Sequence, residues 1–171
     1  MKSSILKAAV FSTAVLSFSV IASSQTKVEL KDAQGKSVGT ATIKPAKTGV
    51  QIALNLHDLP AGQHAIHIHQ NAKCEAPDFK SAGGHFNPDS KHHGTENPDG
   101  HHAGDMQNIT VPEKGKLKTT ITNADVNLKD DSHSVFSNGG TALVIHAKAD
   151  DMKTDPAGNA GDRIACGTIT K

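Results

Sequence analysis

The chain has 171 residues, a formal net charge of +1 and an aromatic content of 3%, with no Trp and no Tyr. This near-neutral charge argues against nucleic-acid binding and attachment to an anionic membrane, and the scarcity of aromatic rings argues against base-stacking platforms. Histidine is the exception, because nine of the 11 histidines lie between His57 and His102. Histidine is the commonest metal ligand and the usual proton carrier near neutral pH, so the cluster predicts a site of that kind.

The N-terminus has the pattern of an export signal. Lys2 and Lys7 precede an apolar run over residues 8–21, and the small residues 22–24 form a cleavage site before Gln25. A membrane anchor is the alternative, but a spanning helix needs about 20 apolar residues, and this run is shorter and contains serines. We therefore expect residues 1–24 to be a cleaved signal peptide. Residues 25–171 are then one domain, exported to the periplasm or the extracellular space, with no stable membrane insertion after cleavage.

Short strands separated by turns follow the leader. Residues 50–56 alternate strictly between aliphatic and other side chains, which is typical of a strand with one buried face. Strands are expected over residues 28–30, 38–43, 50–56, 64–69, 107–111, 117–121, 141–146 and 163–169. This pattern predicts an all-β domain, an eight-stranded Greek-key flattened barrel of the immunoglobulin-like sandwich type.

Two long segments interrupt this regular spacing, over residues 70–105 and 148–162. Loops of this length inside a compact domain are usually functional. The first contains much of the histidine excess and Cys74, and the second leads directly into Arg163 and Cys166. Residues 123–138 are polar and are expected to form an ordinary surface loop.

The histidines of the expected strand 64–69 point to a metal pair. Residues two apart on a strand face the same side, so His67 and His69 can converge on one ion, while His64 points the other way. In the following loop, His85, a His-His pair at 92–93 and another at 101–102 recur every eight or nine residues, and Asp105 follows. Three imidazoles and one carboxylate form the four-coordinate shell that structural zinc accepts. A solvated histidine-rich loop is the alternative.

Cys74 and Cys166 are the two cysteines of the chain. An even number in an exported protein predicts a disulfide. The chain-entropy model gives a loop of this length roughly 4 kcal/mol of stabilisation. A catalytic cysteine with a histidine base is the less favoured alternative.

From about Val28 to its end, the chain resembles the Cu,Zn superoxide dismutases of the exported bacterial type. The resemblance rests on a specific series of stretches in a fixed order. These are residues 62–69 (GQHAIHIH), Cys74, 84–88 (GHFNP), 102–105 (HAGD), 143–151 (LVIHAKADD) and 158–167 (GNAGDRIACG). The chain departs from the family pattern in two places. It has Ala65-Ile66 where many members have Gly-Phe, and it lacks a common glycine in residues 70–73. Neither departure removes an expected ligand.

The resemblance implies a role for each site residue. Copper would be bound by His67, His69, His85 and His146, and zinc by His85, His93, His102 and Asp105, so that His85 bridges the two ions. Asp150 would join copper-side and zinc-side histidines, and His64 would support the site without binding metal. Cys74 and Cys166 would form the disulfide. His57, His92, His101 and His133 would be surface residues.

The implied activity is that of an antioxidant oxidoreductase, which converts superoxide to dioxygen and hydrogen peroxide by Cu(II)/Cu(I) cycling beside a structural zinc. Arg163 would dock the superoxide anion, and His85 would exchange a proton. Lys153 would either steer the anion or be an ordinary surface lysine. Both a monomer and a homodimer remain open.

Two other functions fit parts of the pattern. An exported copper- or zinc-binding protein without catalysis could use the same fold, but it would not need Arg163 beside a complete copper set. A zinc hydrolase would need an open zinc position and a general base. Residues 67–69 lack the aspartate two residues on that a metallo-β-lactamase-like motif requires.

Overall fold

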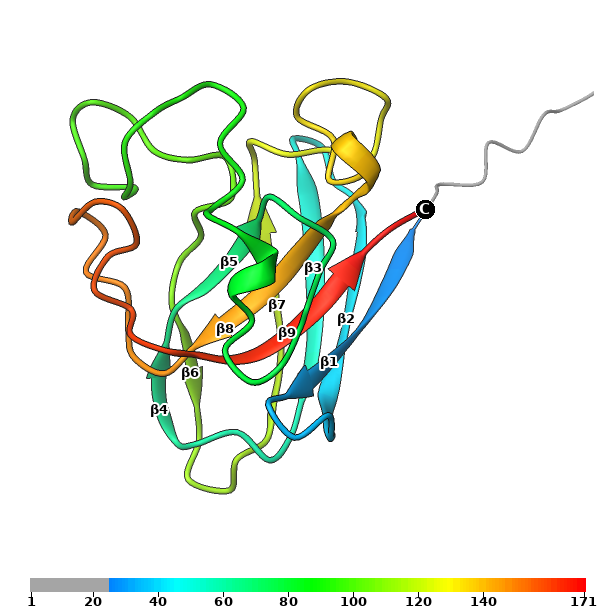
Figure 1. The fold of residues 1–171 in the computed structure, drawn as a ribbon, viewed down its shortest axis with the longest axis vertical. Coiled ribbons are helices and arrows are strands. Elements are labelled where there is room, and N and C mark those ends of the chain that lie inside the picture. The colour runs from blue at the N-terminus through cyan, green and yellow to red at the C-terminus, as the bar shows by residue number, and fades with distance from the viewer. Residues whose placement is uncertain (1–24) are drawn as a thin grey trace, which may run out of the picture.

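A computed structural model describes residues 25–171, and the expected signal peptide over residues 1–24 lies outside them (Figure 1). The described part is all-β, apart from two single 3-10 turns, η1 (Lys80–Ala82) and η2 (Ser137–Gly139). No helix in these residues is long and apolar enough to cross a membrane.

Nine strands form the domain. They are β1 (Thr26–Asp32), β2 (Ser37–Pro45), β3 (Val50–Leu56), β4 (Gly62–His64), β5 (Ile66–His69), β6 (Ile109–Val111), β7 (Leu117–Asn123), β8 (Thr141–His146) and β9 (Arg163–Ile169). Seven make one antiparallel sheet in the order β5-β8-β9-β1-β2-β3-β7, and β4 pairs with β6. The sheet curls around a core, as Figure 1 shows, which confirms the all-β flattened-barrel expectation.

The core follows from the alternation of the strands. In β3 every second residue is buried, and Ile52 and Leu54 pack with Ile43 of the neighbouring β2 at 1% exposure or less. Each such aliphatic side chain contributes about 1.5–3 kcal/mol when it is fully buried. Packing of this kind fixes the register of the sheet, because a slip by one residue would turn the whole apolar face to solvent.

The strand expected over residues 64–69 is interrupted at Ala65, which gives nine strands instead of eight. The Ala65 N–H donates to the Lys148 carbonyl (2.8 Å), and the Ala65 carbonyl accepts from the His146 N–H (2.9 Å). These partners come from a distant part of the chain, so the local alternation could not indicate the break. The interruption lets β4 pair with β6, while β5 pairs with β8.

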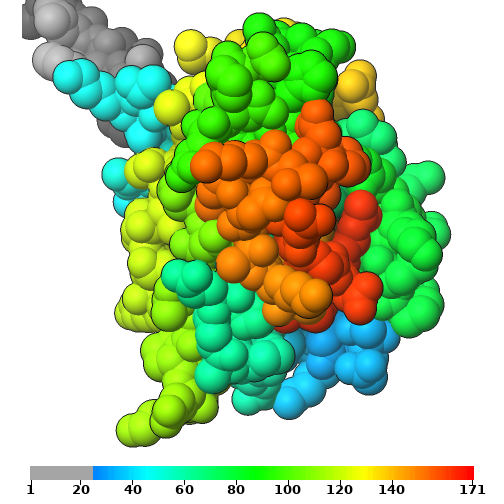
Figure 2. Space-filling view, turned by 90° about the vertical axis from the view of Figure 1, so that its left-hand side faces the viewer, coloured from blue at the N-terminus to red at the C-terminus, as the bar shows by residue number. Residues whose placement is uncertain are grey.

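The two long loops leave the sheet near each other and pack together. They span residues 70–108 and 147–162, and Figure 2 shows them, in green and orange, in contact on one face. The Glu96 N–H donates to the Met152 carbonyl (3.1 Å). Gly94 allows this approach, because a Cβ there would lie 2.1 Å from the Met152 oxygen, and its φ is +105°.

The expected disulfide is confirmed. Cys74 and Cys166 are joined with Cα atoms 5.6 Å apart, which attaches the first long loop to β9. The polar segment after β7 differs from the expectation of an ordinary surface loop. Val126 and Val135 are at most 1% exposed and join the core, and Asn123 is also buried.

Candidate metal centre

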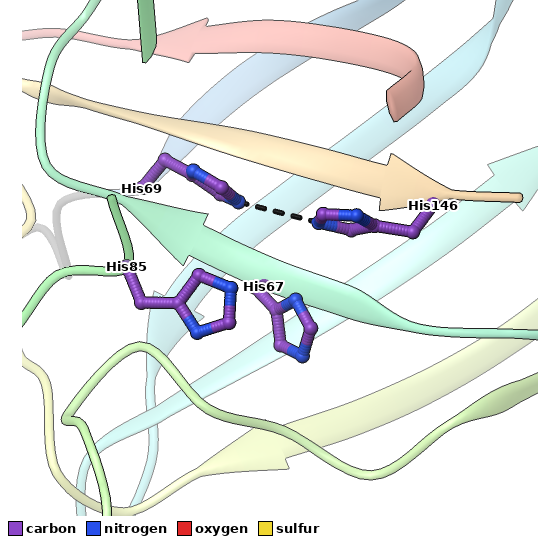
Figure 3. A group of neighbouring side chains, drawn as sticks. All are labelled: His67, His69, His85 and His146. Atoms are coloured by element: carbon purple, nitrogen blue, oxygen red, sulfur yellow. Dashed lines mark hydrogen bonds between the residues drawn. The ribbon is translucent and has the colours of Figure 1, made fainter. Parts of the chain in front are cut away.

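Four buried histidines meet at the edge of the sheet. His67 and His69 lie on the same face of β5, His146 ends the adjacent β8, and His85 comes from the first long loop (Figure 3). One potential ligand atom from each residue lies within 4.8 Å of those of the others. The four residues expected to bind copper are therefore brought together.

The first long loop reaches the site by pairing with β5. The Ile68 N–H donates to the Gly104 carbonyl (2.9 Å), and the Ile68 carbonyl accepts from the Phe86 N–H (2.8 Å). Gly104 has no room for a side chain, since a Cβ would lie 2.2 Å from the Ile68 oxygen. The two loop segments are thereby fixed beside β5, and they place His85 and Asp105 next to the strand.

Two nitrogens of this group are buried without a hydrogen-bond partner, namely His67 Nδ1 and His85 Nε2. His69 Nε2 and His146 Nε2 face each other at 3.3 Å, and at most one proton can lie between them. Unpaired buried polar atoms are costly unless something binds them. Imidazole nitrogens are ligands that copper accepts readily, so this donor set fits a copper ion.

The second group consists of His85, His93, His102 and Asp105. The Nδ1 atoms of the three histidines lie 2.8, 3.1 and 3.3 Å from Asp105 Oδ1. In a tetrahedral zinc site with bonds of 2.0–2.1 Å, neighbouring ligand atoms are about 3.3 Å apart. The other oxygen of Asp105 accepts from the N–H groups of Gly94 and His102, which holds the carboxylate in place. The group therefore fits zinc.

His85 belongs to both groups. Its Nδ1 faces Asp105 on the zinc side, and its Nε2 is the unpaired nitrogen on the copper side. One imidazole ring can thus join two ions through its two nitrogens.

Asp150 also connects the two sides. Its Oδ2 accepts from His67 Nε2 (2.7 Å) and its Oδ1 from His93 Nε2 (3.0 Å). Burial alone would raise the pKa of Asp150, but these hydrogen bonds outweigh it and hold the pKa below its usual range. Asp150 therefore remains a carboxylate and orients one histidine of each group, leaving the Nδ1 of each ring to face its own group.

Arg163 begins β9 beside the copper-side histidines. Its guanidinium donates to the carbonyls of Phe79 (2.8 Å) and Gly83 (2.7 Å), and His69 Nδ1 lies 2.9 Å from the same Gly83 oxygen. The 70–108 loop therefore fixes the position of this positive charge relative to His69.

Comparison with known proteins points to the same family as the sequence motifs and the two donor groups. A family model described as copper/zinc superoxide dismutase matches residues 37–169. The chain belongs to the copper/zinc superoxide dismutase family.

Relatives cover nearly the whole chain. A Cu-Zn superoxide dismutase 1 of Aquifex aeolicus is 47% identical over 157 residues, which is 91% of this chain and 93% of the relative. Among solved structures, a SOD-like protein from Bacillus subtilis has a TM-score of 0.81 at 40% identity, covering 84% of this chain and 97% of that one. The Cu/Zn superoxide dismutase from Brucella abortus has a TM-score of 0.71 at 29% identity, covering 85% and 99%.

The two groups differ in their proton affinity. Burial, together with the neighbouring His67, lowers the pKa of His146 to about 3, and burial also lowers the pKa of His85 to about 4 although Asp105 opposes that shift. Burial works against a charged His93 too, but hydrogen bonds to Asp105 and Asp150 raise its pKa to about 9. At neutral pH the rings of His85 and His146 are therefore neutral, so each keeps one nitrogen free of a proton, whereas His93 carries a proton on both nitrogens.

The remaining histidines have other partners. His64 Nδ1 lies 2.8 Å from the His146 carbonyl oxygen and its Nε2 2.9 Å from that of Pro60, so both ring nitrogens are engaged, as a supporting residue requires. The four expected surface histidines each face a carboxylate, in the pairs His57–Asp58, His92–Asp155, His101–Asp125 and His133–Asp89. The Lys153 ammonium is exposed and pairs with Glu96 (3.0 Å), and its steering role stays a prediction.

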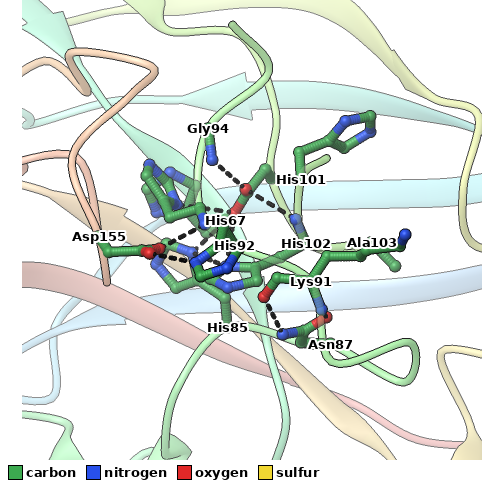
Figure 4. A network of polar contacts seen from close by, with 12 residues as sticks. His67, His85, Asn87, Lys91, His92, Gly94, His101, His102, Ala103 and Asp155 are labelled. Atoms are coloured by element: carbon green, nitrogen blue, oxygen red, sulfur yellow. Dashed lines mark hydrogen bonds and ion pairs between the residues drawn. The ribbon is translucent and has the colours of Figure 1, made fainter. Parts of the chain in front are cut away.

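Two residues that sequence reasoning missed hold the zinc-side loop. Asp155 accepts from the His93 N–H and from His92 Nδ1, and it joins the two long loops (Figure 4). The buried Asn123 donates to the Ala103 carbonyl (2.8 Å) beside His102. No local pattern marks either residue, because each acts on a segment far away in the sequence.

Proposed function

We propose that this protein dismutates superoxide with the residues described above, as a copper- and zinc-loaded enzyme. The observation that carries the proposal is the His85 ring, which faces the copper-side histidines with one nitrogen and the zinc-side ligands with the other. When bound, copper supplies one-electron redox chemistry and zinc supplies a fixed positive charge. Two superoxide anions and two protons then yield one dioxygen and one hydrogen peroxide.

The chain's own residues have distinct tasks in this reaction. Arg163 binds the anionic substrate, since its guanidinium is always charged and is held by two carbonyls next to His69. His85 takes up a proton at Nε2 and gives it to the product, because its Nδ1 stays directed at Asp105. Asp150 keeps the His67 ring oriented. Arg163 favours the enzyme over a copper or zinc carrier, which has no use for an anion-binding cation there.

The test is dismutation by purified, metal-loaded protein. His67→Ala should abolish both the activity and copper loading while the fold, measured by circular dichroism, is retained. His133→Ala is the matched control, since that histidine pairs with Asp89 on the surface, and it should behave as the wild type. Full activity in His67→Ala would overturn the assignment.

We infer further that residues 1–24 are a cleaved signal peptide and that residues 25–171 work outside the cytoplasm. The charged start, apolar run and small-residue cleavage site support this, and the Cys74–Cys166 disulfide suits an oxidising compartment. The N-terminal sequence and cell fraction of the natural protein test the proposal. Intact residues 1–24 on a cytoplasmic protein would contradict it, and the mass in solution would decide between a monomer and a homodimer.

A further inference from the structure

Asn108 makes an unusual contact with the residue that connects the two metal groups. Its side-chain Nδ2–H donates to the Asp150 carbonyl (2.9 Å), and its Oδ1 accepts from the Asp150 N–H (2.8 Å). The two residues are 42 positions apart. Asn108 directly precedes β6 and follows Asp105 by three residues, whereas Asp150 lies in the 147–162 loop. One side-chain amide thus pairs with both backbone groups of Asp150, as a neighbouring strand would.

The Asp150 backbone depends on this amide. Within residues 25–171, the backbone N–H and carbonyl of Asp150 form no hydrogen bond with another main-chain group, so Asn108 supplies the partner for both. Asp150 is only 5% exposed. Buried backbone groups need partners, so loss of the Asn108 amide would leave two of them unpaired or force the loop to move.

The carboxylate of Asp150 has little freedom of its own. Its Oδ2 contacts His67 Nε2, and its Oδ1 contacts both His93 Nε2 and the Met152 N–H. A shift of the Asp150 backbone would therefore move these contacts together. We propose that Asn108 is a positioning residue that fixes Asp150 and thereby sets the orientation of one copper-side and one zinc-side histidine at once. This inference rests on the proposed copper and zinc site.

The connection also runs along the chain. Asn108 belongs to the segment that carries Asp105, whose carboxylate faces all three zinc-side histidines. The amide thus ties the segment that holds the zinc-side ligands to the carboxylate that orients His67. Occupancy of the zinc group and the geometry of the copper group are coupled through Asn108 as well as through His85.

The test compares Asn108→Ala with Asn127→Ala. Asn127 is the matched control, because its amide makes an exposed contact with Asp131 within the segment after β7, away from both metal groups. Outer partners of metal ligands typically contribute 10–100-fold to metal affinity, and Asn108 acts one step further out. We expect Asn108→Ala to weaken zinc binding roughly tenfold in a chelator competition and to change the Cu(II) electron paramagnetic resonance spectrum. Asn127→Ala should do neither.

Two further variants separate positioning from a general loss of structure. Asn108→Asp keeps an acceptor for the Asp150 N–H but places a carboxylate oxygen against the Asp150 carbonyl, so it should show the same spectral change. In an Asp150→Ala background, Asn108→Ala should have almost no additional effect on zinc affinity, because the carboxylate through which Asn108 acts on His93 is gone although the backbone groups that it bonds remain. Zinc affinity within about twofold of wild type, or fully additive losses in the double variant, would overturn the inference. Wild-type protein that binds both ions without dismutating superoxide would instead refute the proposed function.

Discussion

The copper-side and zinc-side groups are built on different kinds of structure. Three of the four copper-side histidines lie on β5 and β8, whose register is fixed by the packed core. All four zinc-side residues, His85 included, lie in the first long loop, which is held by a few contacts with β5 and with the second long loop. A site on strands is preorganised by the fold, whereas a site on a loop depends on a few polar contacts and on its ion.

The groups also differ in charge. On the copper side, His85 and His146 have lowered pKa values and the group contains no carboxylate, while the zinc side has Asp105 and a protonated His93. The metal-free zinc side thus resembles a buried ion pair, in which the extra proton of His93 supplies part of the positive charge that zinc would bring opposite Asp105. The two ions should therefore respond differently to ligand loss and to pH.

The largest effect should come from removing a metal ligand, and the ion that is lost should depend on the group from which the ligand is removed. His146→Ala should abolish copper binding and leave zinc bound, because His146 belongs to the copper group alone. Asp105→Ala should weaken zinc binding by roughly a thousandfold, beyond the 10–100-fold typical of outer partners, and leave copper binding within a few-fold. Metal analysis after dialysis measures both. Loss of both ions in each variant would show that the groups are not separable.

Acidification should weaken zinc binding before copper binding. Below pH 9 the metal-free His93 carries an extra proton that zinc must displace, so zinc affinity should fall about tenfold per pH unit, or about 100-fold from pH 8 to pH 6. His85 and His146, with pKa values of about 4 and 3, have no such proton to lose in this range. Titrations with each ion alone at pH 6, 7 and 8 measure the slopes. Equal slopes for the two ions would contradict the predicted difference in the pH dependence of their affinities.

Substitution of Arg163 should affect catalysis without affecting either ion. A hydrogen bond to a charged group contributes about 1.5–3 kcal/mol, so Arg163→Ala should lower kcat/KM at least about tenfold and weaken its dependence on salt. Arg163→Lys should restore the salt dependence but not the full rate, because lysine lacks the planar fork that holds the Phe79 and Gly83 carbonyls. Stopped-flow assays over a range of ionic strength test this. An unchanged rate in Arg163→Ala would remove the residue from the reaction.

The smallest effect should come from the contact between the long loops. Asp155→Ala removes the acceptor of the His93 N–H, so zinc affinity should fall about fivefold while copper affinity stays within twofold. Asp89→Ala is the control, because Asp89 pairs with the surface residue His133 in the same way as Asp155 pairs with His92. Competition with a fluorescent zinc chelator resolves such a change. Equal behaviour of the two variants would mean that the loop contact does not hold the zinc side.

Much of the fold could be read from the sequence because its causes are local. The alternation in β3 and the turns around it are properties of neighbouring residues. The break at Ala65 and the burial of Val126 and Val135 are different, because each depends on a partner far along the chain. The polar composition around Val126 indicated a surface loop, and the two valines could not show which way they faced.

The candidate site divides in the same way. His67 and His69 could be paired from strand periodicity, and family resemblance selected His93 and His102 from their pairs. The structure brings these residues together with His85. Asn108 and Asp155 carry no sequence signal, since a polar residue in a loop has many ordinary uses. Their contacts exist only when the two long loops meet.

The most direct measurement is a crystal structure of the copper- and zinc-loaded protein, with anomalous scattering recorded at both metal absorption edges. It should show copper at His85 Nε2 together with His67, His69 and His146, and zinc at His85 Nδ1 together with His93, His102 and Asp105. A His85 ring that contacts only one ion, or an ion bound outside these two groups in their place, would contradict the shared-histidine site.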